Sequence, residues 1–179
     1  MRILSLDIST TTIGLAVIDY DDQGMNLVFL DYFKPPKKGS IFKRLSETKE
    51  YILGILDKYK PDDVAIEDFI LFMAGKSGAK TIVPLAIINR MIGLTVLEVI
   101  GKEPHLFNVN SIRAKLKRDD KKRLQKEDMP DRVAEILGID FPYKTKINKK
   151  TKIQERIVEN EDMADGIAVG LYFIKTKEK

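Results

Sequence analysis

The amino-acid sequence predicts an α/β protein with a five-stranded mixed sheet flanked by helices. Three apolar, β-rich segments follow one another at the start of the chain and are joined by short polar turns, which is typical of an antiparallel meander. Beyond them, helical and strand-like patterns alternate, as in β-α units with parallel strands. The 179 residues show no internal repeat and no domain boundary, so we expect one domain over residues 1–179.

The predicted strands are short apolar runs bounded by turn residues. They cover residues 2–8, 13–20, 27–33, 64–69 and 105–109. The polar turn from Ser9 to Thr12 separates the first two, and the hairpin-type turn from Asp21 to Gly24 separates the second and third. The fourth and fifth strands follow helical segments, so we expect them to extend the sheet beyond the meander.

The predicted helices carry apolar residues at helical spacing. They cover residues 42–59, 81–100, 111–117, 131–137 and 160–175. Lys60 and Pro61 stop the first helix, and Gly101 stops the second. Residues 142–156 have little periodicity and many lysines, so we expect a mobile basic loop there.

The composition is that of a globular protein, with 44% apolar and 32% charged residues. The chain has no cysteine, which excludes a disulfide scaffold, a thiolate metal site and a cysteine nucleophile. The only histidine, His105, begins a predicted strand, and we interpret it as structural. The longest unbroken apolar run, residues 167–174, is too short to span a bilayer, and Asp7 interrupts the N-terminal stretch that a signal peptide would need. We expect a cytoplasmic protein without a membrane partner.

The positive charge is concentrated in two segments. Residues 113–126 hold eight Lys or Arg and two Asp, a net charge of +6, and residues 144–156 have a net charge of +5. The whole chain is only +4, so the remainder is acidic. A basic arm on an acidic body indicates a polyanionic partner, although a solvated lysine-rich surface explains the same composition.

Four acidic residues stand where a core would not place them. Asp7 and Glu67 lie near the ends of apolar strands, and Asp162 and Asp165 lie in the first turns of an apolar helix, on one face. Each has an ordinary explanation, since acids form turns at strand ends and favour helix N-termini, where Asn160 is a candidate cap. Together they indicate a site for a divalent cation, because Mg²⁺ and Mn²⁺ prefer carboxylate oxygens and relieve the mutual repulsion.

The same residues carry a family resemblance. Residues 2–9 read RILSLDIS and residues 14–18 read GLAVI, followed by AIE at 65–67 and DMADGIA at 162–168. In this order they resemble the motifs of RuvC-type Holliday junction resolvases, which are DNA endonucleases of recombination and repair with a ribonuclease H-like fold. The resemblance covers most of the chain, and it implies a crossover junction endodeoxyribonuclease.

The resemblance also implies the active site and its chemistry. The catalytic and metal-binding residues would be Asp7, Glu67, Asp162 and Asp165, with Asp7 as the bridge between two ions. Two Mg²⁺ ions, for which Mn²⁺ substitutes, would lie roughly 3.5–4 Å apart at the scissile phosphate. No protein nucleophile is needed, which suits a chain without cysteine.

The sequence departs from the family pattern beside two of the acids. Asp68 follows Glu67 directly, where no acid is expected. The position of the family's base-contacting aromatic residue is Ile70, so either Phe69 or Phe72 would take that role, or both would belong to the core. Glu161 also competes with Asp162 as a ligand, and the family spacing favours Asp162.

The resemblance further implies DNA contacts in the first basic segment and in the loop after Glu67. The candidate DNA-binding residues are Phe69, Phe72, Lys76, Lys80, Arg113, Lys115, Lys117, Arg118, Lys121 and Lys122. Their cationic side chains would contact phosphates. The lysines between Lys144 and Lys152 are interpreted as a tether that adds affinity but no geometry.

The helix over residues 81–100 is apolar around nearly its whole circumference, which predicts burial on more than one side. The family forms a two-fold dimer through this helix, and two active sites suit a junction that needs two symmetric cuts. We therefore expect a homodimer, with Ile92 in the contact and Gly93 allowing close approach of the partner helix.

Other functions stay open at this stage. A nuclease for other branched, flapped or RNA-containing substrates would share the chemistry, and a catalytically inactive DNA-binding relative would share the fold. An ATP-binding protein of the actin and sugar-kinase type is an alternative from a different functional class. It is considered because residues 7–12 resemble the first phosphate loop of such proteins. That loop usually has Gly where Ser9 stands, and the class needs a second domain.

Overall fold

A computed structural model describes residues 1–68, 79–118 and 124–177. Its main sheet has the strand order β3-β2-β1-β4-β5. The strands are β1 (Arg2–Ile8), β2 (Ile13–Asp21), β3 (Gly24–Phe33), β4 (Asp63–Asp68) and β5 (His105–Asn108). The helices are α1 (Ile41–Tyr59), α2 (Ala79–Ile100), α3 (Val109–Leu116), α4 (Met129–Leu137) and α5 (Glu159–Lys177). The predicted fold class is confirmed, and so is the predicted order of these strands and helices.

The sheet combines both strand directions. β1, β2 and β3 form the predicted antiparallel meander, and β4 and β5 run parallel to β1. The turn between β2 and β3 closes through the side chain of Asp21, which accepts from the backbone N–H groups of Gln23 and Gly24. Gly24 itself has a φ of 150°, a backbone conformation that side chains rarely allow.

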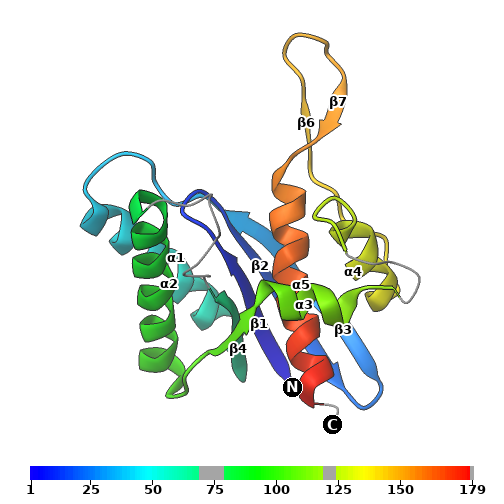
Figure 1. Cartoon of the computed structure of the whole chain (residues 1–179), viewed down its shortest axis with the longest axis horizontal. Helices are drawn as coiled ribbons and strands as arrows, with labels where there is room; N and C mark the ends of the chain where they lie inside the picture. Colours follow the sequence, from blue (N-terminus) through cyan, green and yellow to red (C-terminus); the bar gives the residue numbers. More distant parts are fainter. Residues whose placement is uncertain (69–78, 119–123, 178–179) are drawn as a thin grey trace.

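Helices cover both faces of the sheet, with α1 and α2 on one face and α3, α4 and α5 on the other (Figure 1). Side chains alternate between the two faces along each strand. Leu4, Leu6 and Ile8 therefore pack under α1 and α2, while Ile3 packs under the second layer. This alternation decides which face each strand-borne acid reaches.

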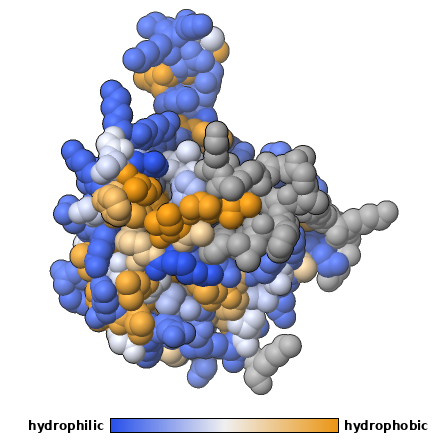
Figure 2. All heavy atoms as spheres, turned by 60° about the vertical axis from the view of Figure 1, so that its left-hand side comes forward, coloured by the Kyte–Doolittle hydropathy of each residue, from blue (hydrophilic) through white to orange (hydrophobic). Residues whose placement is uncertain are grey.

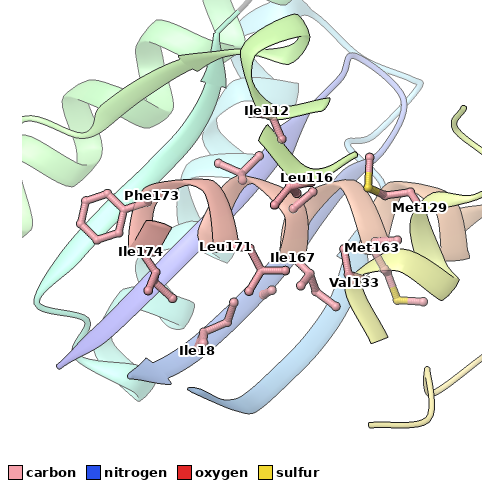
Figure 3. Close-up of a cluster of buried hydrophobic side chains, with 14 of the residues drawn as sticks. Ile18, Ile112, Leu116, Met129, Val133, Met163, Ile167, Leu171, Phe173 and Ile174 are labelled. Atoms are coloured by element: carbon pink, nitrogen blue, oxygen red, sulfur yellow. The ribbon is translucent and has the colours of Figure 1, made fainter. Parts of the chain in front are cut away.

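The helix α5 is the centre of the second layer, and Figure 3 shows its apolar side chains meeting those of α3, α4 and β2. It approaches the sheet unusually closely. A Cβ atom added to Gly170 would lie 2.8 Å from the Ser5 hydroxyl, and one added to Gly166 would lie 3.0 Å from the Gly14 backbone. Small residues at these positions let the helix lie directly on β1 and β2.

The helix α2 is buried on one side only. Ile88, Ile92 and Val96 are buried in the core under the sheet. The opposite side leaves large apolar residues exposed, namely Val83, Ile87, Leu94 and Leu97. The assignment of Ile92 to a dimer contact is therefore wrong, because packing against the sheet already excludes it from solvent. A Cβ at Gly93 would meet Pro104 of the same chain, at 3.5 Å.

Apolar surface gathers on the side of the molecule that carries α1 and α2 (Figure 2). Over residues 82–100, α2 is long and apolar enough to cross a membrane by length and composition, and 28% of this stretch is buried. In the structure it packs beside α1, so its inner side is part of the core.

The segment expected to be a basic loop contains regular structure. Strands β6 (Thr145–Ile147) and β7 (Gln154–Arg156) pair antiparallel and form a two-stranded sheet. The hairpin projects from the molecule beyond the N-terminal end of α5 (Figure 1). Three-residue strands carry too little periodicity to be recognised in the sequence.

Candidate active site

Asp7 and Glu67 lie on neighbouring parallel strands and on the same face of the sheet. Leu6 pairs with Ile66 across β1 and β4, so the two acids follow one residue further along each strand. Leu6 and Ile66 point into the core beneath α1 and α2. Their neighbours Asp7 and Glu67 therefore point to the opposite face, toward α5.

Asp162 and Asp165 are brought to the same place by the close approach of α5. Gly14 pairs with Asp7 across β1 and β2. A Cβ atom on Gly14 would lie only 1.8 Å from the backbone carbonyl oxygen of Asp162. The missing side chain of Gly14 therefore makes room for the first turn of α5 next to the end of β1.

The four carboxylates influence each other's protonation. Burial and the negative charges of Glu67, Asp165 and Asp162 raise the pKa of Asp7 well above its usual value. Burial, together with the charge of Asp165, raises the pKa of Glu67 to about 7. The pKa of Asp165 is raised to about 6, again mainly by burial. Carboxylates that are buried this close together favour a cation among them.

Lys126 supplies positive charge at this place in the structure. Its Nζ donates to an Asp162 carboxylate oxygen at 2.8 Å and lies 3.9 Å from carboxylate oxygens of both Glu161 and Asp165. Although burial works in the opposite direction, its hydrogen bond and ion pairs with these acids raise the pKa of Lys126. In the sequence Lys126 is only one of eight basic residues in its segment, and no motif marks it.

The donor set suits a hard divalent cation, since it consists of carboxylates. Within residues 1–68, 79–118 and 124–177, however, no three His, Cys, Asp or Glu side chains are arranged as a finished metal site. The ammonium group of Lys126 lies against two of the acids. A cation would therefore have to share these carboxylates with Lys126 or replace it.

Two further acids stand next to the predicted ligands in the sequence. Asp68 forms an ion pair with Arg90 of α2 at 2.9 Å, on the next position after Glu67 along β4. Since side chains alternate along a strand, Asp68 leaves the face that carries Glu67. Glu161 lies beside the site, at 3.9 Å from Lys126 Nζ.

Among the predicted DNA contacts that the structure describes, Arg113 is the one that lies at the carboxylates. Its guanidinium Nη2 lies 4.0 Å from an Asp165 carboxylate oxygen. Its Nε is buried and, among the described residues, is the one buried side-chain nitrogen or oxygen without a hydrogen-bond partner. Lys115 and Lys117, further along the same segment, are exposed.

The remaining predicted contacts have mixed outcomes. Arg118 forms a doubly hydrogen-bonded ion pair with Glu135. Lys80 belongs to the first turn of α2 rather than to the expected loop. The predicted contacts that lie outside the described residues are Phe69, Phe72, Lys76, Lys121 and Lys122.

His105 has structural contacts, as expected from its position at the start of β5. Its Nε2 lies 3.4 Å from a carboxylate oxygen of Asp63, and its ring centroid is 4.7 Å from that of Phe173. Asp63 begins β4, whereas Glu67 lies close to the strand's other end. His105 therefore lies at the end of the parallel strands that is opposite to the carboxylates.

Comparisons with known proteins agree with this arrangement. No family model matches the chain. The crossover junction endodeoxyribonuclease RuvC of Finegoldia magna is 24% identical over 174 residues, which is 97% of this chain and 93% of that protein.

Solved structures share the fold. RuvC of T. thermophilus, in complex with a Holliday junction substrate, superposes with a TM-score of 0.72 at 16% identity, covering 99% of this chain and 96% of that one. The fowlpox virus resolvase in complex with Holliday junction DNA has a TM-score of 0.56 at 19% identity, and the match covers both chains completely. In sequence over almost its whole length, and in its ribonuclease H-like fold, the chain resembles the RuvC-type Holliday junction resolvases.

Proposed function

We propose that this protein is a metal-dependent, structure-specific DNA endonuclease that resolves Holliday junctions by hydrolysing phosphodiester bonds. The observation that carries the proposal is the convergence of Asp7, Glu67, Asp162 and Asp165 from β1, β4 and α5 onto one end of the sheet. The similarity to RuvC supports the choice of a four-way junction as substrate.

We infer that the metal is Mg²⁺, with Mn²⁺ as a substitute, and that two ions act at each active site. Asp7, Glu67, Asp162 and Asp165 would hold them. Burial and neighbouring negative charges raise the pKa of Asp7, Glu67 and Asp165, and bound cations would relieve that repulsion. When bound, such ions lower the pKa of a water molecule and stabilise the charge on the leaving oxygen.

The cationic side chains of the site have a separate role. Arg113 presents a guanidinium with an unpartnered Nε beside Asp165, and guanidinium groups match the geometry of phosphate oxygens. We infer that Arg113 holds the scissile phosphate against the carboxylates. The exposed Lys115 and Lys117 would bind the backbone next to it.

The outer side of α2 supports a homodimer. Val83, Ile87, Leu94 and Leu97 recur at helical spacing and are all more than a third exposed. They form an apolar stripe, interrupted by the exposed Arg90 between Ile87 and Leu94, and exposed apolar surface of this kind marks an interaction surface. A second copy of the chain, joined along this stripe, would supply the second active site that symmetric cleavage of a junction requires.

The nucleotide-binding alternative is disfavoured by the turn between β1 and β2. The Ser9 hydroxyl donates to the Thr12 carbonyl oxygen at 2.7 Å and accepts from the backbone N–H groups of Thr11 and Thr12. A phosphate loop keeps its backbone N–H groups for the ligand. Between β1 and β2, two backbone N–H groups already donate to the Ser9 hydroxyl and are not presented to a ligand.

Cleavage of a panel of labelled DNA substrates tests the proposal. The panel contains a four-way junction, a fork, a flap and a linear duplex, each incubated with Mg²⁺. We expect symmetric cuts in the junction, and at least a hundredfold loss of rate in Asp7→Asn and Glu67→Gln, since the amides keep the shape but not the ligand charge.

The variant Asp57→Asn is the control, because Asp57 is an exposed acid on α1. Preferential cutting of the fork or flap would favour the alternative of a nuclease for other branched substrates. A normal rate in Asp7→Asn would refute the active-site assignment.

A further inference from the structure

The hairpin of β6 and β7 carries exposed charge of one sign at its tip. Lys149, Lys150 and Lys152 are exposed within the connection from Asn148 to Ile153. The segment from 144 to 156 holds six basic residues and one acid, Glu155. That acid accepts a hydrogen bond from the Asn148 side chain at 2.8 Å, so its carboxylate is engaged within the hairpin.

The tip is closed by hydrogen bonds within the hairpin. The Asn148 carboxamide oxygen accepts from the backbone N–H groups of Lys150 and Thr151. The Asn148 backbone N–H donates to the Ile153 carbonyl oxygen at 2.9 Å, and Lys152 takes the left-handed conformation that closes the turn. The lysines are therefore presented from a folded ribbon.

The base of the hairpin is fixed to the helix that carries the catalytic acids. The buried side chain of Asn160 accepts from the backbone N–H of Lys144 and donates to its carbonyl oxygen, both at 2.9 Å. The Tyr143 hydroxyl donates to Asp131 of α4 at 2.9 Å, and the Arg156 guanidinium stacks 3.4 Å from the Tyr143 ring centroid. The hairpin and the first turn of α5 thus form one body.

Two aliphatic side chains near the tip of the hairpin are exposed to solvent. Ile147 is 69% exposed and Ile153 is 62% exposed. A two-stranded ribbon fits the major groove of DNA, which is about 12 Å wide, and aliphatic groups there contact thymine methyl groups. Lysines beside them would contact the phosphates that line the groove.

We propose that the β6–β7 hairpin is a DNA-binding element that enters the major groove of the duplex arm next to the scissile phosphate. The proposal rests on the proposed function and adds a contact that extends away from the active site. The six residues from Lys144 to Lys149, of which Thr145–Ile147 form β6, give the hairpin a reach of at most roughly 16 Å. This corresponds to about five base-pair steps along an arm, at about 3.4 Å each.

Two variants remove the contact in different ways. The first is Lys149→Gln, Lys150→Gln and Lys152→Gln together. The second replaces residues 148–153 by Asn-Gly, because Ile147 and Gln154 are already paired and a two-residue turn joins such a pair. The control is Lys58→Gln, Lys60→Gln and Lys102→Gln together. These three exposed lysines lie at or just after the C-terminal ends of α1 and α2.

Binding to a four-way junction is measured in the Asp7→Asn background, so that the DNA stays intact. We expect the lysine variant to bind between about ten- and several-hundredfold more weakly at 0.1 M salt, with a salt slope smaller by about 2.7. The shortened variant should also lose protection of the phosphates furthest from the cut site, over up to about five base pairs. Ile147→Thr with Ile153→Thr should weaken binding without changing the slope.

Failure of this proposal and failure of the proposed function give different results. If the wild type cuts junctions while both hairpin variants keep the wild-type affinity, slope and footprint, the hairpin proposal is wrong and the function stands. If the wild type neither binds nor cuts branched DNA, both are wrong. Loss of a protein partner, with DNA binding unchanged, would make the hairpin a protein-docking element and would also overturn the proposal.

Discussion

At the scale of single residues, the site is defined by competition for four carboxylates. Lys126 donates to Asp162 and lies near Asp165 and Glu161. The Lys126 side chain is half-buried, and the carboxylates of Asp162 and Asp165, whose negative charge it offsets, are largely buried. Lys126 therefore supplies counter-charge where a metal-bound enzyme would need cations, and the two should oppose each other.

We predict that Lys126→Met destabilises the metal-free protein and enlarges the stabilisation by Mg²⁺. Without the ammonium group, the hydrogen bond to a charged acceptor is lost, at a cost on the order of 1–3 kcal/mol. Thermal unfolding is measured in EDTA and then with increasing Mg²⁺, and Lys58→Met is the control for the loss of an exposed lysine. Equal Mg²⁺-induced shifts in Lys126→Met and wild type would mean that ammonium and metal do not share ligands.

At the scale of secondary-structure elements, the site depends on how closely α5 lies on the sheet. Three positions without side chains form this contact, with Gly14 on β2 facing Gly166 and with Gly170 facing Ser5. The helix carries Asp162 and Asp165, whereas the strands carry Asp7 and Glu67. A shift of a few tenths of an ångström between the layers therefore changes the spacing of the ligands.

We predict that Gly14→Ala reduces cleavage by a hundredfold or more and destabilises the fold by about 1–3 kcal/mol, the usual cost of overpacking. The added Cβ meets the Asp162 backbone at 1.8 Å, so the first turn of α5 has to move. Gly54→Ala is the matched control, because nothing lies within 4 Å of its added Cβ on helix α1.

Denaturant unfolding and junction cleavage are measured on both variants. Gly54→Ala should be stabilised by about 0.5–1 kcal/mol, as expected for alanine in a helix interior, and should cleave normally. Wild-type cleavage by Gly14→Ala would show that the position of α5 is not critical for the chemistry.

At the scale of the whole molecule, the two sides of the sheet have different tasks. The layer of α3, α4 and α5 carries the acids and the hairpin, and the layer of α1 and α2 leaves an apolar stripe exposed. A dimer through this stripe would leave the catalytic face and the hairpin of each subunit free for DNA.

We predict that Leu94→Glu yields a folded monomer, whereas Ile92→Glu unfolds the protein. Leu94 is 55% exposed, so a charge there disturbs only a contact with a second copy. Ile92 is fully buried against the sheet, where an unpaired charge is not tolerated. Sedimentation at tens of micromolar, near the range of about 1 μM to 1 mM for weak association, gives the mass, and circular dichroism gives the fold. A monomeric wild type would contradict the dimer.

The acids themselves could be identified from the sequence because their placement is local. The alternation of side chains along a strand puts Asp7 and Glu67 on the face opposite their apolar neighbours, and a spacing of three puts Asp162 and Asp165 on one side of a helix. These relations follow from backbone geometry within a few residues. Apolar periodicity predicted the sheet and the order of helices, and the four carboxylates were grouped by their positions at strand ends and in one helical turn and assigned as the active site by the family resemblance.

Relations between distant segments required the tertiary structure. Lys126 meets Asp162 across 36 positions of the chain, and no local period marks that contact. Apolar periodicity identified α2 but not which side faces the sheet, because Ile92 and Leu94 are equally apolar and only packing distinguishes them. The hairpin is formed by three-residue strands whose base is held by Asn160 and Asp131, from α5 and α4. By itself, the sequence determined which residues each element presents, and the packing of elements decided which of those residues meet, because contact free energy depends on neighbours that are far apart along the chain.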